Sequence, residues 1–171
     1  MFIICYQRIK NEGFKTVIKR TWQSLKSDLK IKKIFVFSFV LAMVLFSTIF
    51  CRVYQSNPLE VVWGNWVVFR EYHILHTEPI ENVLLFIPYT FCFLWAFPSV
   101  LYRGKKIIFI RTVWKALMLA LTSSVCIEMI QLIFRVGTLQ ISDIVYNTLG
   151  GVMGGIGYHI IYRLWYKVKK Q

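Results

Sequence analysis

Apolar residues in this chain gather into four long runs that are separated by shorter polar stretches. The runs extend from Ile34 to Cys51, from Ile80 to Tyr102, from Val113 to Phe134 and from Ile141 to Trp165. A helix of about 20 predominantly apolar residues crosses the hydrocarbon core of a bilayer. The pattern therefore predicts an all-α, polytopic membrane protein with four transmembrane helices.

A different pattern precedes the first run. Between Phe14 and Leu29, apolar residues recur at steps of three and four, with lysines and arginines elsewhere around the helix. This spacing predicts a basic amphipathic helix on the membrane interface, and a solvated tail that only sets orientation is the alternative. We therefore divide the chain into an interfacial segment at residues 1–33, a membrane domain at 34–165 and a basic tail at 166–171.

Positive charge is distributed unevenly around these runs. Of the 21 lysines and arginines, all but Arg52, Arg70 and Arg135 lie in the N-terminal segment, around the loop between the second and third runs, or near the C-terminus. Cytoplasmic loops of membrane proteins carry such an excess. Both termini are therefore predicted to be cytoplasmic. Nucleic-acid binding is not expected, because the basic residues flank the spans and match no nucleic-acid-binding motif.

The strongest polar residues of the spans fall near their predicted outer ends. At the end of the third run, steps of four, three and four place Ser124, Glu128, Gln131 and Arg135 on one helical face. An ionisable group in the bilayer costs about 2.5–3.5 kcal/mol on insertion scales, so it is retained where it is paired or functional. We therefore expect a ligand-binding pocket, open to the outer leaflet, formed by Arg52, Asn82, Ser124, Glu128, Gln131, Arg135, Asp143 and Asn147.

Small residues and a proline predict how the helices pack. Gly150, Gly151, Gly154 and Gly155 form two overlapping Gly-x-x-x-Gly repeats, and small residues let helix backbones approach closely. Pro88 removes a hydrogen bond within the second helix. We expect this proline to kink the helix and to open a gap on its outer half.

Three of the candidates also have structural explanations. Glu128 could be a buried hydrogen-bonding group, Asp143 an N-cap of its helix, and Asn147 a hydrogen-bonded link between helices. No metal or other cofactor is expected, because the polar residues of the outer loop match no established zinc spacing. Those loop residues are Glu71, His73, His76 and Glu78. The four cysteines, Cys5, Cys51, Cys92 and Cys126, suggest neither zinc binding nor a disulfide framework.

Three motifs occur in order along the chain. They are Asn82 leading into Phe86-Ile-Pro88, then Ser124-x-x-x-Glu128-x-x-Gln131, then Asp143-x-x-x-Asn147-x-x-Gly150-Gly151. Together they resemble the VanZ-like family, small membrane proteins named for an accessory teicoplanin-resistance protein. Arg52 after the first span is also typical of the family. The resemblance covers roughly residues 34–165, and Tyr89 departs from it where the family often has a small residue.

The resemblance implies a multi-pass protein of a bacterial cytoplasmic membrane, associated with reduced susceptibility to lipoglycopeptides, and it implies no established reaction. Our leading hypothesis is a non-catalytic cell-envelope protein that binds a lipid-like ligand, such as a lipid-linked cell-wall precursor or teicoplanin. One alternative is an intramembrane enzyme with Glu128 and Asp143 as acid and base, although the chain has no G-x-S-x-G or H-E-x-x-H motif. Another is a small transporter, dimeric through its glycine face.

Overall fold

The computed structural model describes residues 28–64, 66, 69–70, 74–75, 77–102 and 107–168, together with Thr16 and Lys19. The chain divides into two units, residues 1–36 and 37–171. The amphipathic helix predicted between Phe14 and Leu29 lies almost wholly outside the described residues.

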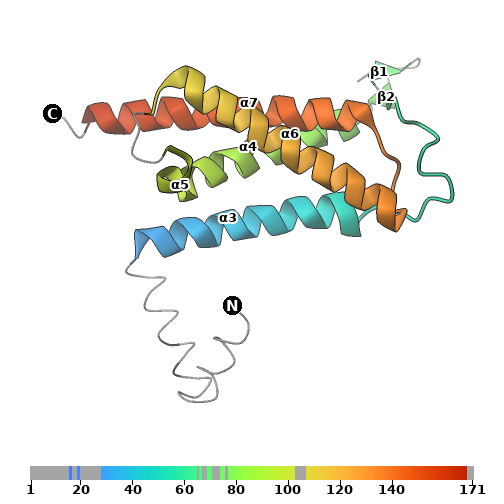
Figure 1. Cartoon of the computed structure of the whole chain (residues 1–171), viewed down its shortest axis with the longest axis horizontal. Helices are drawn as coiled ribbons and strands as arrows, with labels where there is room; N and C mark the ends of the chain where they lie inside the picture. Colours follow the sequence, from blue (N-terminus) through green and yellow to red (C-terminus); the bar gives the residue numbers. More distant parts are fainter. Residues whose placement is uncertain are drawn as a thin grey trace. The chain divides into compact units, whose positions relative to one another are not determined.

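The regular elements among the described residues are helices, apart from one short hairpin (Figure 1). The hairpin pairs strand β1 (Phe69–Arg70) with strand β2 (Ile74–Leu75) in antiparallel register. The all-helical class predicted from the sequence is thus confirmed. The helices are α3 (Leu29–Leu45), which continues into the π-helical turn η1 (Phe46–Phe50), then α4 (Glu78–Ala96), α5 (Pro98–Tyr102), α6 (Phe109–Phe134) and α7 (Ile141–Val168).

Among the described residues, three helices are long and apolar enough to cross a membrane: Leu29–Phe50, Glu78–Ala96 and Phe109–Phe134. They correspond to the first three predicted spans. The second was expected to reach Tyr102, but α4 ends at Ala96, because a proline at position 98 disfavours helical geometry at the residue before it. Helix α7 has 28 residues and is long enough to cross a membrane, yet it is not one of the three helices that are also apolar enough. Its many glycines and polar side chains reduce its apolar content.

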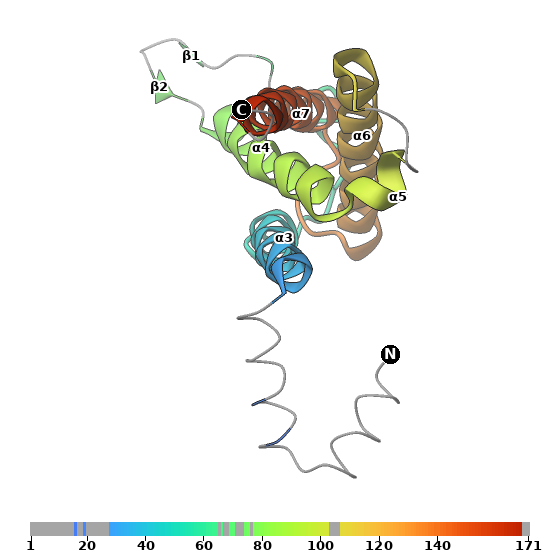
Figure 2. The ribbon, with the colours of Figure 1, turned by 90° about the vertical axis from the view of Figure 1, so that its left-hand side faces the viewer.

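Helix α7 lies between α4 and α6 and packs against both (Figure 2). Gly150 and Gly154 face α4, where an added Cβ would lie 2.3 Å from the carbonyl oxygen of Val83 or of Ile87. The two Gly-x-x-x-Gly repeats contact different helices, because the second repeat, Gly151 and Gly155, faces α6. There an added Cβ at Gly151 or Gly155 would lie 2.2 Å from Ala120 Cβ or 2.3 Å from Ala116 Cβ. The glycine face proposed for a dimer is therefore occupied by the chain's own helices.

The second half of α3 packs on α4 through aromatic rings. The ring of Phe37 lies 5.2 Å from that of Phe93 and 5.5 Å from that of Phe97, both edge to face. Such arrangements align the positive edge of one ring with the negative face of another. Val44 belongs to the same apolar cluster and is buried two turns further along α3. This packing sets the position of the polar segment that follows η1.

Pro88 lies inside α4, but the face that carries it points away from the other helices. Its side chain is exposed, and so is that of Leu84, whose carbonyl loses its helical partner to the proline ring. The gap expected from this kink therefore does not open toward Asn82, which is buried on another face of α4. Close packing of α4 depends on the carbonyls facing Gly150 and Gly154 instead.

Candidate functional site

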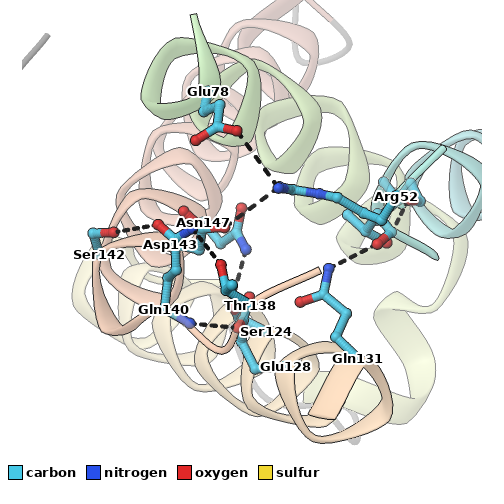
Figure 3. A network of polar contacts seen from close by, with 12 residues as sticks. Arg52, Glu78, Ser124, Glu128, Gln131, Thr138, Gln140, Ser142, Asp143 and Asn147 are labelled. Carbon is cyan, nitrogen blue, oxygen red and sulfur yellow. Dashed lines mark hydrogen bonds and ion pairs between the residues drawn. The ribbon is translucent and has the colours of Figure 1, made fainter. Parts of the chain in front are cut away.

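A largely buried polar network connects four helices on one side of the second unit (Figure 3). It draws on the turn after η1, the start of α4, the last third of α6 and the start of α7. The side chains that take part are Arg52, Glu78, Ser124, Glu128, Gln131, Gln140, Asp143 and Asn147. Segments far apart in the sequence therefore meet through their polar groups.

Arg52 supplies the positive charge of the network. One of its guanidinium nitrogens, Nη1, lies 3.6 Å from Glu78 Oε1, and the other, Nη2, lies 3.5 Å from Asp143 Oδ2. These distances are longer than those of charge-assisted hydrogen bonds, so the interaction is mainly electrostatic. Asp143 is the more buried of the two carboxylates. Arg52 thus links the end of the first helix to the starts of α4 and α7.

Glu128 is almost wholly buried, at 2% exposure. Its Oε2 accepts a hydrogen bond of 2.9 Å from the backbone N–H of Gln140, the residue directly before α7. Backbone N–H groups at the start of a helix have no partner within that helix. Glu128 therefore ties the turn between α6 and α7 back onto α6.

Two amide side chains complete the links between helices. Asn147 Nδ2 donates to Ser124 Oγ at 2.9 Å, which joins α7 to α6. Gln131 Nε2 donates to the carbonyl oxygen of Thr48 at 2.7 Å, which joins α6 to η1. That carbonyl belongs to the last turn of its helix, where carbonyls lack an intrahelical partner. Each amide uses only one of its polar atoms in these bonds.

Three buried amide atoms at the network have no hydrogen-bond partner within the described structure: Asn82 Nδ2, Gln131 Oε1 and Asn147 Oδ1. Their residues are 5%, 2% and 2% exposed. The oxygen of Gln131 is assigned securely, because the Thr48 carbonyl that its amide contacts can only accept. Asn82 lies beside Asp143 without reaching bonding geometry. Each such atom costs about 1–3 kcal/mol if water or a ligand never reaches it.

Comparison with known families identifies the chain. The profile of the VanZ/LLP1 family matches residues 13–163, which is most of the sequence. The chain belongs to the VanZ/LLP1 family. No curated protein and no solved structure matched it. The resemblance seen in the three motifs is therefore confirmed. The family match also begins earlier than the motifs did, within the basic N-terminal segment.

The network of this VanZ/LLP1 protein contains most of the residues that the motifs singled out. Arg52, Ser124, Glu128, Gln131, Asp143 and Asn147 are joined by the contacts above, and Asn82 lies among them. Tyr89, where the chain departs from the motif, is buried and its hydroxyl pairs with Ser123 Oγ at 2.7 Å. The larger side chain is thus accommodated by a hydrogen bond to α6.

Arg135 makes none of the contacts of the network, so its predicted role in ligand binding stays a prediction. It follows the end of α6 with left-handed backbone angles (φ 53°, ψ 38°), and its side chain is exposed. Its N–H caps the helix by bonding the carbonyls of Gln131 and Leu132. The step of four that placed Arg135 on the face of Glu128 assumes a continuing helix. The left-handed turn removes that relation.

Sequence reasoning missed other members of the network. Glu78 was grouped with loop histidines, although its position at the Glu-Pro start of the second apolar run was a usable signal. Gln140 and Thr48 contact Glu128 and Gln131 through backbone atoms. A backbone contact leaves no trace in residue type, so no sequence signal could have found these two.

The loops that adjoin the network are joined to each other. Residues 53–62 and 135–141 form a ladder of four backbone hydrogen bonds of 2.8–3.0 Å, from Gln55 to Arg135, Gly137 to Val53, Leu139 to Pro58 and Ile141 to Val62. Gly64 closes a turn on Val61 with φ +75°, and an added Cβ there would lie 1.9 Å from Ser142 Oγ. The outer loop therefore turns at Gly64, and this turn packs against the start of α7.

The described residues contain no group of three His, Cys, Asp or Glu side chains arranged to hold a metal ion. Three of the loop residues considered as metal ligands, Glu71, His73 and His76, lie outside the described residues, as does Cys5. Within the described part of the chain, Cys51, Cys92 and Cys126 are unpaired. The side chains of the network carry carboxylate, amide, hydroxyl and guanidinium groups.

Proposed function

We propose that this VanZ/LLP1 protein crosses the membrane four times, with α7 as the fourth span. At about 1.5 Å per residue its 28 residues extend roughly 42 Å, enough to cross a bilayer. Its glycines and polar side chains face α4 and α6, whereas Leu149, Met153 and Ile161 are more than half exposed. A lipid-facing surface of this kind is apolar even though the helix as a whole is less so. The internal position of α7 supports the proposal.

The distribution of charge supports an orientation with both termini in the cytoplasm. The N-terminal segment, the region around residues 103–115 and the C-terminal tail carry nearly all the basic residues. In this orientation the polar network lies near the outer surface of a bacterial cytoplasmic membrane. Lipids of the outer leaflet and lipid-linked cell-wall precursors would be its neighbours.

We propose that the network binds the polar part of a lipid-like ligand and thereby alters susceptibility to lipoglycopeptides such as teicoplanin. The observation that carries this proposal is the group of three unpartnered amide atoms on Asn82, Gln131 and Asn147. Buried polar groups in proteins are ordinarily satisfied, so three exceptions in one cluster require an explanation. A ligand that supplied the missing partners would provide it.

The unused atoms also indicate what the ligand carries. Two of them, Gln131 Oε1 and Asn147 Oδ1, are acceptors. The one guanidinium, on Arg52, already faces two carboxylates. Groups that donate hydrogen bonds, such as hydroxyl, amide or ammonium groups, therefore fit the network better than a bare phosphate does. Sugars and peptides of cell-wall precursors and of glycopeptides carry such groups.

The test exchanges an unpartnered polar group for an apolar one of similar shape. Asn82→Leu should leave the melting temperature close to that of the wild type, because Asn82 Nδ2 is buried without a hydrogen-bond partner. It should abolish the protein's effect on teicoplanin susceptibility if the amide binds a ligand. Thr90→Val is the matched control, since Thr90 Oγ1 is also buried and unpartnered in α4 but lies against Gly151. Retained function in both variants would refute ligand binding at Asn82.

Glu128→Ala and Asn147→Ala remove side chains that do make hydrogen bonds within the network. Both variants should lose function while membrane abundance stays close to that of the wild type. Loss of the folded protein instead would favour the structural explanation, in which Glu128 only holds the turn at Gln140. Membrane abundance is measured by immunoblot, and binding by mass spectrometry of lipids that copurify with the full chain.

A second candidate function is an intramembrane enzyme acting on a lipid-linked precursor. The observation that favours it is the proximity of two buried carboxylates, Glu128 and Asp143, which are close enough to interact electrostatically. A pair of carboxyl groups in different surroundings can act as acid and base. Purified protein that leaves labelled lipid-linked precursors chemically unchanged would exclude this function.

A further inference from the structure

A groove lies at the far end of α7 from the polar network. It has a volume of about 660 Å³, and Phe109 at the start of α6 forms one side. The other side is the last part of α7, from His159 to Lys167. His159 is 18 residues beyond Ile141, or roughly 27 Å at 1.5 Å per residue. This is close to the thickness of a hydrocarbon core, so the groove and the network would adjoin opposite leaflets.

The α7 side of the groove has two parallel stripes of different character. His159, Arg163 and Lys167 recur at steps of four and share one helical face. Ile160 and Leu164 form the adjacent apolar stripe. None of the residues that line the groove is acidic. The surface therefore carries a basic stripe and an apolar stripe side by side along the same two turns of α7.

His159 provides a second, independent sign of a ligand. It is 5% exposed, and its Nδ1 has no hydrogen-bond partner within the described structure. Its ring lies 5.4 Å from that of Phe109, edge to face, which holds the imidazole between the two helices. Arg163 and Lys167, by contrast, are exposed. A buried imidazole with an unused nitrogen and two exposed cations thus line one groove.

We propose that this groove binds one anionic phospholipid, with the phosphate held by Arg163, Lys167 and His159. An acyl chain would lie along Ile160 and Leu164 against Phe109. Basic pockets between membrane helices on the cytoplasmic side bind anionic head groups in this way. The site is separate from the polar network, so it can exist whether or not the network binds a ligand.

The experiment measures lipid retention by the full-length purified protein in nanodiscs of phosphatidylglycerol or of phosphatidylcholine. Native mass spectrometry should show one retained phosphatidylglycerol and no retained phosphatidylcholine. Each basic residue contributes about a factor of five near an anionic surface, so the double variant Arg163→Gln, Lys167→Gln should weaken retention by roughly 30-fold. Equal retention of the two lipids would refute the proposal.

Two further variants separate a specific site from general attraction to negative charge. The double variant Lys30→Gln, Lys32→Gln removes two exposed lysines of α3 and serves as the charge-matched control, which should retain the lipid. Leu164→Trp fills the groove without changing charge and should abolish retention. Similar losses in both charge variants, or full retention by Leu164→Trp, would show that no groove-bound lipid exists. Gel filtration of each variant verifies that it is folded.

Discussion

Helix α7 is attached to its neighbours in two different ways along its length. At its start, Asp143 and Asn147 contact Arg52 and Ser124 through an ion pair and a hydrogen bond, and amide atoms remain unused. In its middle, four glycines touch α4 and α6 so closely that no methyl group fits. Close contact leaves no freedom for another partner. The middle of α7 therefore stabilises the fold by close packing, while the start of α7 keeps amide atoms that could bind another group.

The contrast predicts that substitutions in the middle should destroy the folded protein. Gly154→Ala should be severely damaging, because its methyl would meet the backbone carbonyl of Ile87 at 2.3 Å, and so should Gly150→Ala. A backbone atom cannot rotate away, so we expect a loss of about 3 kcal/mol in the free energy of unfolding, the upper part of the range for overpacking. Thermal unfolding of the purified protein and its membrane abundance measure this.

Gly157→Ala is the matched control for that prediction. This glycine lies on the same helix, but an added Cβ would come no closer than 4.0 Å to Phe91 Cδ2. Alanine also has a higher helix propensity than glycine. The variant should therefore unfold at the wild-type temperature or above. Equal damage from both alanines would show that the close approach at Gly154 is not what stabilises the fold.

The α6 side of the same segment should tolerate a compensating change. Gly155→Ala would bring its methyl to 2.3 Å from Ala116 Cβ, at a cost of about 1–2 kcal/mol. The double variant Gly155→Ala, Ala116→Gly moves the methyl from one helix to the other and should recover most of the lost stability. A double-mutant cycle on thermal unfolding gives the coupling. Additive losses would contradict the direct contact.

At the start of α7, breaking the ion pair should have a smaller effect on the fold. Arg52→Gln should reduce the free energy of unfolding by about 1 kcal/mol, because the guanidinium is partly exposed and its contacts are 3.5–3.6 Å long. Adding Asp143→Asn should recover part of this loss, since the more buried of the two carboxylates that faced Arg52 is then no longer present. If Arg52→Gln alone unfolds the chain, the start of α7 is as essential to the fold as its middle.

The smallest effect is expected at Arg135. Arg135→Gly should raise the free energy of unfolding by about 0.5–1 kcal/mol, because glycine adopts the left-handed conformation without the steric cost of a Cβ. Teicoplanin susceptibility should remain that of the wild type, since this side chain is exposed and outside the network. A functional defect with normal stability would show that the Arg135 side chain takes part in the function.

The sequence was sufficient for the helices and for most of the site. Apolar length predicted where each helix lies to within a few residues, and α3 and α6 begin four or five residues earlier than the apolar runs. The extra residues include Lys30, Lys32 and Arg111, whose long side chains can keep their charges in water at a helix end. The steps of four and three placed Ser124, Glu128 and Gln131 together, and the structure does bring them into one network.

The sequence by itself determined helix lengths and the residues that share a face, because both follow from local geometry along one chain. Only the tertiary structure decided that Gly150 and Gly154 face α4 while Gly151 and Gly155 face α6. It also decided that Glu128 meets a backbone N–H and that three amide atoms stay unpartnered. These properties depend on where neighbouring helices and loops lie, and no periodicity within one segment specifies that.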